Sequence, residues 1–132
     1  MTVNYVTKHV LVVDDTPSIR QSICKALQTE GCECHQAVNG FAALEELKKE
    51  HFDLVLTDYR MPLMDGMEFL KQLAGQQESY VSPLAIMMTS ECDDAIQQQA
   101  MKAGAFLVLQ KTCDVHQFVS RIMNVLARKP FS

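Results

Sequence analysis

Aspartate residues stand at the carboxyl ends of two apolar runs of this chain, and a lysine follows a third run. Residues 9–13 lead to Asp14 and Asp15, residues 52–57 lead to Asp58, and residues 106–110 lead to Lys111. Short runs of β-branched and aliphatic residues between turn signals are typical of buried parallel strands. In open α/β sheets, ligands bind beyond the carboxyl ends of the strands. We therefore expect these four side chains to converge on one rim of a parallel sheet.

The three aspartates predict a cation site. Neighbouring carboxylates raise each other's pKa, so three of them cannot all be ionised at one place without a positive partner. Hard divalent cations with oxygen ligands suit such a site. We expect Asp14, Asp15 and Asp58 to bind Mg²⁺ rather than Ca²⁺.

Strand-like and helix-like segments alternate along the chain. The expected order is strand 9–13, helix 17–30, strand 33–37, helix 41–50, strand 52–58, helix 66–74, strand 83–89, helix 91–103, strand 106–111 and helix 115–126. The polar stretch 75–82 is expected to be a surface loop. Alternating units of this length predict a five-stranded parallel sheet with helices on both faces.

Capping residues and apolar stripes support these helices. Thr16, Ser90 and Asp114 are expected to cap the first, fourth and fifth helices, and Asp65 with Glu68 resembles a capping box before the third. Apolar residues at helical spacing predict the buried face of each helix. The stripes are Ile19, Ile23, Ala26 and Leu27; Phe41, Leu44 and Leu47; Met67, Leu70 and Leu73 or Ala74; Ile96, Ala100 and Ala103; Val115, Phe118, Val119, Ile122 and Leu126.

The composition fits one globular domain and argues against other classes of protein. The 132 residues are 48% hydrophobic, which is enough for one core, and the net charge is −4. No cluster of Lys and Arg exceeds two residues, which argues against direct binding of nucleic acid. No apolar stretch is long enough to span a membrane. The first eight residues lack the layout of a signal peptide, so we expect a cytoplasmic protein.

The five cysteines do not predict a disulfide framework, because their number is odd and they are scattered along the chain. The sequence Cys32-Glu33-Cys34-His35 invites a metal interpretation. Its spacing is wrong for a zinc knuckle, and no second cysteine–histidine pair follows it. We interpret these cysteines as small buried side chains.

In order and spacing, the motifs of this chain resemble those of a response-regulator receiver domain of two-component signalling. The matching residues are Asp14-Asp15, Asp58, Met61-Pro62-Leu63-Met64-Asp65-Gly66, Thr89, Gly104-Ala105 and Lys111. The resemblance implies a (βα)₅ flavodoxin-like, doubly wound fold with strand order 2-1-3-4-5. We expect residues 1–132 to form a single receiver domain, with its core at about 9–127. It would be a stand-alone receiver of the chemotaxis type or one excised from a longer protein.

The resemblance also implies a metal site and a reaction. Mg²⁺, with Mn²⁺ as an alternative, would be bound by Asp14, Asp15, Asp58 and the backbone carbonyl of Arg60. A histidine kinase or a histidine phosphotransfer protein would transfer a phosphoryl group to the Asp58 carboxylate. The protein would be a signalling phosphoacceptor that assists its own phosphorylation and dephosphorylation, and not an enzyme.

The remaining roles implied by the resemblance concern the switch. Lys111 would pair with the phosphoryl oxygens, and the Thr89 hydroxyl would move to hydrogen-bond them. The surface formed by the fourth helix, fifth strand and fifth helix would then change its preference for an unknown downstream protein. The chain would be a monomer or a phosphorylation-linked dimer.

Three positions depart from the family pattern. Thr112 stands where the family usually has proline after a cis peptide, and we expect a trans Lys111–Thr112 bond because a cis bond there costs about 2.5–4 kcal/mol. Val108 stands where an aromatic side chain often rotates inward, so the switch would rely on displacement of residues 90–104 instead. Ser90 is larger than the usual residue and would narrow access to Asp58.

Alternatives to this function remain open. Taken singly, Asp14 and Asp15 could cap a helix, Asp58 could form an Asx turn, Thr89 could be a strand former and Lys111 could be a solvated charge. A pseudo-receiver would bind partners without phosphorylation, although its usual mark, loss of the acceptor or of the acidic pair, is missing. A haloacid-dehalogenase-like phosphatase would have Asp-x-Asp and a cap domain, whereas here the aspartates are adjacent and no insertion could form a cap.

Overall fold

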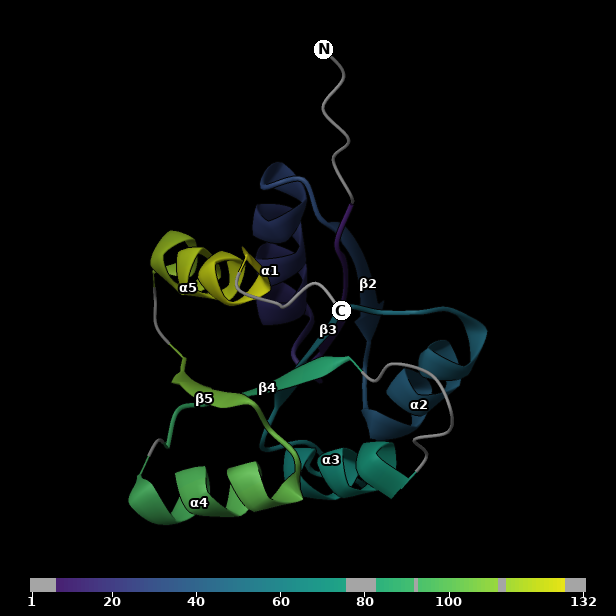
Figure 1. Cartoon of the computed structure of the whole chain (residues 1–132), viewed down its shortest axis with the longest axis vertical. Coiled ribbons are helices and arrows are strands. Elements are labelled where there is room, and N and C mark those ends of the chain that lie inside the picture. Colours follow the sequence, from purple (N-terminus) through teal and green to yellow (C-terminus); the bar gives the residue numbers. More distant parts are fainter. Residues whose placement is uncertain (1–6, 76–82, 92, 112–113, 128–132) are drawn as a thin grey trace.

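The structure is a computed structural model that describes residues 7–75, 83–91, 93–111 and 114–127. Along these residues five strands and five helices alternate, as predicted (Figure 1). The elements are β1 (His9–Val13), α1 (Pro17–Thr29), β2 (Glu33–Ala37), α2 (Gly40–Lys49), β3 (Leu54–Asp58), α3 (Gly66–Gly75), β4 (Leu84–Thr89), α4 (Asp94–Ala103), β5 (Leu107–Gln110) and α5 (Val115–Ala127). None of these helices is both long and apolar enough to cross a membrane within the residues that the structure describes.

The strands form one parallel sheet in the order β2-β1-β3-β4-β5, which confirms the predicted flavodoxin-like topology. Helices α1 and α5 cover one face, and α2, α3 and α4 cover the other (Figure 1). Val13 is in register with Thr57, and Asp58 with Met88. The carboxyl ends of β1, β3 and β4 therefore lie level with one another at one edge of the sheet.

The core has two layers because side chains alternate between the faces of each strand. Val10, Val12, Leu54 and Leu56 pack toward α1 and α5, whereas Leu11 and its neighbours pack toward α2, α3 and α4. Strands buried on both faces need apolar residues at successive positions. This explains why the central strands are continuous apolar runs in the sequence.

Two of the expected helix caps are confirmed. The carboxylate of Asp65 accepts a hydrogen bond from the backbone N–H of Glu68 at 2.9 Å, and Asp114 accepts one from Gln117 at 3.1 Å. Gly104 ends α4 in the left-handed conformation, with φ of 119°, directly after residue 103, where the helix was expected to end.

One cap prediction was wrong, and a second is confirmed in its position but not in its hydrogen bond. Asp93 and not Ser90 caps α4, because the helix begins at Asp94 and the Asp93 carboxylate accepts from the backbone N–H of Ile96 at 2.8 Å. Thr16 occupies the cap position of α1, but its hydroxyl makes no capping bond. Instead the Asp14 carboxylate accepts from the Thr16 backbone N–H at 2.9 Å, which fixes the turn between β1 and α1.

Three apolar residues that were expected in the core are exposed. Phe41 is 53% exposed because the preceding Gly40 packs against Met64 and turns the next residue outward. Ile19 is 37% exposed and borders a pocket between α1 and α5. Phe106 is 53% exposed and precedes β5, whose first residue is Leu107, rather than opening it.

Two expectations fall outside the described residues, the surface loop over residues 76–82 and the trans Lys111–Thr112 peptide. Gly75 itself closes α3 and does not open the loop.

Candidate functional site

The three aspartates meet at the carboxyl edge of the sheet, as the sequence predicted. Carboxylate oxygens of Asp14, Asp15 and Asp58 all lie within 4.8 Å of one another. Asp14 follows β1 and is fully buried, and Asp58 ends β3 with 6% exposure, whereas Asp15 is exposed. Neighbouring strands in parallel register bring the first and third of these carboxylates together, and the adjacent position supplies Asp15.

Lys111 connects the two buried carboxylates. Its ammonium nitrogen Nζ is 3.1 Å from Oδ1 of Asp58 and 3.2 Å from Oδ2 of Asp14. The backbone N–H of Lys111 donates to the carbonyl of Thr89 at 2.8 Å, which ties the end of β5 to the end of β4. The predicted convergence of the strand-end residues is thereby confirmed for the lysine as well.

Burial and charge shift the pKa values at this edge. Burial raises the pKa of Asp58, and the negative charge of Asp14 raises it further, although Lys111 offsets part of the increase. Burial lowers the pKa of Lys111, but its hydrogen bond with Asp58 and the charges of both carboxylates outweigh burial, so that pKa is raised overall. Three carboxylates against one ammonium leave two negative charges, which is the charge that a divalent cation neutralises. The donor set fits a hard cation such as Mg²⁺.

Arg20 is a residue of this site that the sequence did not indicate. The residue is 8% exposed, and Nη1 of its guanidinium donates to the backbone carbonyl of Asp14 at 2.8 Å. Its Nε donates to the side-chain oxygen of Gln36 at 2.9 Å. Arg20 therefore holds the turn after β1 against β2. An arginine between two isoleucines of an amphipathic helix carries no pattern that would predict this position.

Thr89 and Arg60 approach the site through Glu91. The Thr89 side chain is 1% exposed, and its hydroxyl oxygen accepts from the backbone N–H of Glu91 at 3.0 Å. The guanidinium of Arg60 donates to both carboxylate oxygens of Glu91 at 3.2 and 3.1 Å and lies 4.8 Å from the ring centroid of Tyr59. The loops after β3 and β4 are therefore linked across the edge by an exposed ion pair. The role of the Arg60 carbonyl as a metal ligand stays a prediction.

Gly66 determines how closely α3 approaches Asp58. Its backbone N–H donates to the carbonyl of Tyr59 at 2.7 Å. A Cβ at Gly66 would collide with the backbone carbonyl of Asp58 and lie 2.9 Å from Cε of Met87. Only glycine leaves the room that this approach requires.

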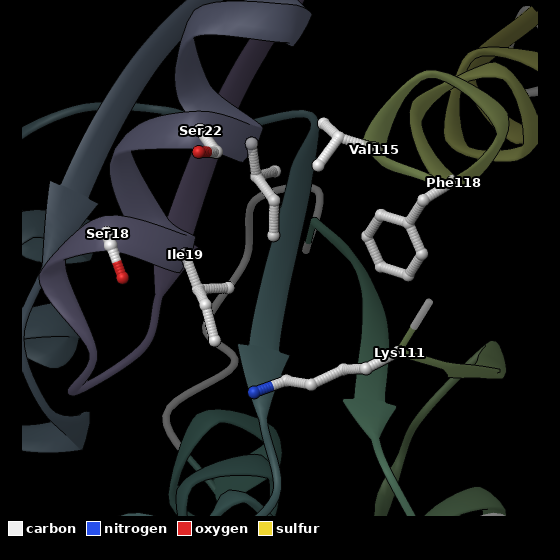
Figure 2. Close-up of a pocket in the computed structure, with 7 residues that line it drawn as sticks. Ser18, Ile19, Ser22, Lys111, Val115 and Phe118 are labelled. Atoms are coloured by element: carbon white, nitrogen blue, oxygen red, sulfur yellow. The ribbon is translucent and has the colours of Figure 1, made fainter. Parts of the chain in front are cut away.

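A pocket of about 420 Å³ lies between α1 and α5 beside the carboxylates. Ser18, Ile19 and Ser22 line it from α1, and Val115 and Phe118 line it from α5, as Figure 2 shows. Lys111 also lines the pocket, and Figure 2 shows its extended side chain below Ile19 and Phe118. The side chain that lines this pocket is therefore also the one whose nitrogen pairs with Asp58 and Asp14.

Comparison with known families identifies the chain. The family described as "Response regulator receiver domain" matches residues 10–123. The chain therefore belongs to the family of response regulator receiver domains, which are signalling phosphoacceptors of two-component systems rather than enzymes in the ordinary sense. Receiver domains bind Mg²⁺ in an acidic pocket, and they partner with a histidine kinase or a phosphotransferase.

Curated relatives include both short and long proteins. Sporulation initiation phosphotransferase F of Bacillus subtilis is 32% identical over 120 residues, which cover 91% of this chain and 94% of that protein. Several longer bacterial regulators also match, and the chain spans about a quarter of their length, 26% and 24% for two of them. The receiver fold is thus found both alone and as part of larger proteins.

Solved structures agree with the fold. Chemotaxis protein CheY4 of Vibrio cholerae has a TM-score of 0.83 and 32% identity, with 91% of this chain and 99% of that chain covered. Response regulator protein TrrA of Thermotoga maritima, solved in complex with Mg²⁺ and BeF, has a TM-score of 0.76 and 27% identity, with 90% and 99% covered.

Proposed function

We propose that Asp58 accepts a phosphoryl group from a histidine kinase or a histidine phosphotransfer protein in a Mg²⁺-dependent reaction. One observation carries the proposal: Lys111 bridges Asp58 and Asp14 within a cluster of three carboxylates. A structural aspartate does not need a second buried carboxylate beside it. Burying two negative charges together costs free energy unless cations compensate them, and Lys111 and a divalent cation would do so here.

The metal site of this proposal uses residues already brought together. The carboxylates of Asp14, Asp15 and Asp58, with the backbone carbonyl of Arg60, would hold Mg²⁺, and Mn²⁺ has the same preference for oxygen ligands. The bound ion would neutralise the oxygens of the phosphoryl group during transfer. Asp15 is exposed and would bind the ion directly, whereas the buried Asp14 would act largely through bound water.

In the reaction itself, a carboxylate oxygen of Asp58 attacks phosphorus as the bond from phosphorus to the donor's histidine nitrogen breaks. A carboxylate is a weak nucleophile, so positioning and charge neutralisation provide most of the catalysis. The Lys111 ammonium, already 3.1 Å from Asp58, would move to form an ion pair with the phosphoryl oxygens. The histidine leaves with its electron pair and recovers a proton from solvent.

The proposed switch begins at Thr89. Its hydroxyl oxygen accepts a hydrogen bond from the Glu91 backbone N–H at 3.0 Å. This bond must break when the hydroxyl turns to the phosphoryl group. Glu91 lies just before the Asp93 cap of α4, so the change loosens the start of that helix. Helix α4 rests on small residues such as Ala100 and Ala103, which allow it to slide. Val108 lacks an aromatic ring, so the signal would reach the α4-β5-α5 surface through α4 itself.

The direct test is labelling with acetyl phosphate and Mg²⁺, followed by mass spectrometry of the intact protein and its peptides. We expect one phosphoryl group on Asp58, none without a divalent cation, and none in Asp58→Asn. The matched control is Asp94→Asn, an exposed aspartate of α4, which should be labelled like the wild type. Labelling that persists in Asp58→Asn would overturn the proposal.

Two outcomes would favour the alternatives. Failure to bind beryllofluoride with Mg²⁺ in a folded protein would favour a pseudo-receiver, although the acceptor and the acidic pair are both present. Turnover of phosphate monoesters would favour a phosphatase. We further propose that residues 1–132 form one receiver domain, supported by the family match over 10–123, and that it is a monomer or a phosphorylation-linked dimer.

A further inference from the structure

A second charged cluster lies at the opposite end of the sheet from the phosphoacceptor. His9 opens β1 and Glu33 opens β2, and the two residues are paired in register. Asp14 is five residues farther along β1, so the clusters are roughly 16 Å apart at the rise of a parallel strand. Helix α2 packs against β2 at this edge of the sheet (Figure 1) and contributes Glu46 and Glu50 from its carboxyl-terminal end.

The motif Cys32-Glu33-Cys34-His35 divides between the two faces of the sheet. Cys32 and Cys34 pack into the core layer beneath α1 and α5, which confirms them as small apolar side chains. Glu33 and His35 point to the other face, toward α2. The alternation of strand side chains therefore removes the thiols from the cluster and leaves its carboxylate and imidazole groups together.

Short contacts connect the members of this cluster. Nδ1 of His9 is 2.9 Å from Oε2 of Glu33, and the same oxygen is 3.4 Å from Nε2 of His35. That Nε2 atom is also 3.5 Å from Oε1 of Glu50. Ligand atoms of His9, Glu33 and Glu50 all lie within 4.8 Å of one another.

These spacings fit atoms arranged around a metal ion. Two ligands at about 2.1 Å from a tetrahedral zinc ion lie roughly 3.4 Å from each other. The three contacts from the two imidazoles to Glu33 and Glu50, at 2.9, 3.4 and 3.5 Å, cluster around this separation. Ligand atoms of His9, Glu33 and Glu50 already lie close enough to surround one cation, whereas those of His35 lie within the same limit of Glu46 and Glu50. His35 would reach the same cation through its contacts with Glu33 and Glu50, after rotation of these side chains.

The His9 imidazole supplies an independent observation. Its Nδ1 atom is buried and has no hydrogen-bond partner, although Glu33 is only 2.9 Å away. The two atoms are close enough for an ion pair but form no hydrogen bond, and the His9 side chain as a whole is 34% exposed. An unsatisfied buried nitrogen costs free energy, and a cation between this nitrogen and the oxygen would satisfy both atoms.

His35 has the surroundings of a metal-bound imidazole. Its Nδ1 atom, on the other side of the ring from Glu33, is 3.7 Å from Oε1 of Glu46. Metal-bound histidines usually face a carboxylate through their second nitrogen, which orients the ring. The ring also packs edge-on against Phe52, with centroids 5.3 Å apart, which restricts its rotation.

The charge at this edge also favours a cation. Glu33, Glu46 and Glu50 give three negative charges, and the carboxyl-terminal end of α2 adds the negative end of a helix dipole. Lys49 approaches Glu46 at 3.5 Å but is 69% exposed, so its charge is well solvated.

We propose that His9, Glu33, His35 and Glu50 form a binding site for a divalent transition metal of the Zn²⁺ class, with Glu46 orienting His35. Imidazole nitrogens select Zn²⁺ over Mg²⁺, whereas the all-oxygen cluster at Asp58 has the reverse preference. Bound metal would fasten the end of α2 to the edge strand β2 and leave the phosphoacceptor untouched. The site is independent of the proposed phosphorylation.

The test is titration of the purified protein with Zn²⁺ in the presence of excess Mg²⁺, which occupies the Asp58 cluster. Calorimetry should give one Zn²⁺ per chain, and the unfolding midpoint should rise with Zn²⁺ and fall back with a chelator. Co²⁺ in place of Zn²⁺ should give visible absorption bands without the near-ultraviolet band of thiolate ligands. In NMR spectra the ring resonances of His9 and His35 should shift, and those of His116 should not.

Substitutions separate this site from adventitious binding. His35→Gln and Glu50→Gln should remove the calorimetric signal, and Glu46→Gln should weaken binding by about tenfold. The matched control is His116→Gln, an exposed histidine of α5, which should bind Zn²⁺ like the wild type. Glu50 is exposed at the end of α2, so its variant tests the site even if a strand variant fails to fold.

Three results would overturn the proposal. The first is the absence of Zn²⁺ binding when excess Mg²⁺ is present. The second is Zn²⁺ binding that persists in both His35→Gln and Glu50→Gln. The third is a thiolate band with Co²⁺, which would assign the metal to the cysteines. Acetyl phosphate labelling of Asp58 should proceed equally in Glu50→Gln, so failure here and failure of the phosphoacceptor proposal are distinguishable.

Discussion

The two charged clusters at opposite ends of the sheet differ in how firmly they are built. At the carboxyl end, Asp14 is fully buried, Asp58 is 6% exposed, and Arg20 and Lys111 hold them from two directions. At the amino end, the side chain of Glu33 is 51% exposed and that of Glu50 is 38% exposed, and both can turn. Burial fixes charges in a costly arrangement at one end, while exposure leaves the other end adaptable.

Electrostatic free energy is concentrated at the carboxyl end of the sheet, where the charges are buried. Charges removed from water interact strongly and shift pKa values, as the raised pKa of Asp58 indicates. Exposed charges are screened, and their pairs contribute little to stability. We therefore expect substitutions at the carboxyl end to change the free energy of unfolding far more than substitutions at the amino end.

Gly66→Ala should have the largest effect, because it tests the rigid backbone behind the buried cluster. The added methyl group would collide with the Asp58 carbonyl, which is part of β3 and cannot move without disturbing the sheet. We expect a loss of about 3 kcal/mol in the free energy of unfolding, measured by urea denaturation. In the fraction of the Gly66→Ala variant that folds, phosphorylation should also be slower, since Asp58 is displaced.

Gly75→Ala is the matched control, because Gly75 ends the same helix with nothing within 4 Å of an added Cβ. It should be neutral or slightly stabilising, since alanine is the better helix former. Equal losses in both variants would mean that α3 is sensitive to alanine in general and would refute the special role of Gly66.

Lys111→Met comes next, because it removes the ammonium group that lies between the two buried carboxylates. In the absence of Mg²⁺, we expect the free energy of unfolding to fall by about 2 kcal/mol. Removing one partner of a fully buried ion pair costs about 3–5 kcal/mol, and the cost is smaller here because the lysine side chain is 23% exposed. Added Mg²⁺ should restore part of this loss by supplying the missing positive charge. Urea denaturation with and without Mg²⁺ measures both effects.

Two comparisons sharpen the Lys111 result. Lys102→Met changes an exposed lysine of α4 and should leave the free energy of unfolding unchanged. In the absence of Zn²⁺, His35→Gln in the amino-end cluster should lower the free energy of unfolding clearly less than Lys111→Met does. A larger cost for His35→Gln would reverse the ranking of the two clusters.

Asp58→Asn should stabilise the protein by about 1 kcal/mol at neutral pH in the absence of Mg²⁺, a typical size for one substitution. The folded pKa of Asp58 is raised above its ordinary value of 3.8. Its bound proton therefore contributes stability that is fully present below 3.8 and is lost as the pH rises through the raised pKa. The advantage of asparagine should accordingly be small in acid, grow across the titration and then level off. An advantage that is equal at all pH values would show that repulsion is not its cause.

The same contrast explains what the sequence could predict. The strand-end residues were predictable, because two physical rules suffice: buried parallel strands are apolar runs, and their carboxyl ends share an edge. Asp14, Asp58 and Lys111 needed no more than that. Their contacts follow from the register of the strands, which the apolar runs largely determine.

Other features depend on tertiary geometry that leaves no local pattern. Arg20 sits in an ordinary helical sequence, and only the position of α1 places it at the Asp14 carbonyl. Ser90 was a reasonable cap, but the chain continues three more residues before α4 begins and Asp93 takes the role. Phe41 has the spacing of a core residue and yet points outward. The amino-end cluster combines residues from β1, β2 and α2 that no single motif unites.

The smallest effect on stability is expected for the pair formed by Arg60 and Glu91. This pair tests whether the exposure of charged side chains or their nearness to the buried carboxylates determines their contribution. The pair lies beside the buried cluster, but its side chains are 66% and 53% exposed. If exposure determines the strength of the pair, the urea midpoint of unfolding should be the same as in the wild type for Arg60→Gln, Glu91→Gln and the double variant. Raised salt should not change how these midpoints rank. If nearness to the buried charges determines the effect instead, Glu91→Gln should unfold at a lower urea concentration, because it removes the carboxylate that pairs with Arg60. A shift as large as that of Lys111→Met would show that the Arg60–Glu91 pair interacts as strongly as the buried carboxylates, so that exposure does not determine the strength of these charges.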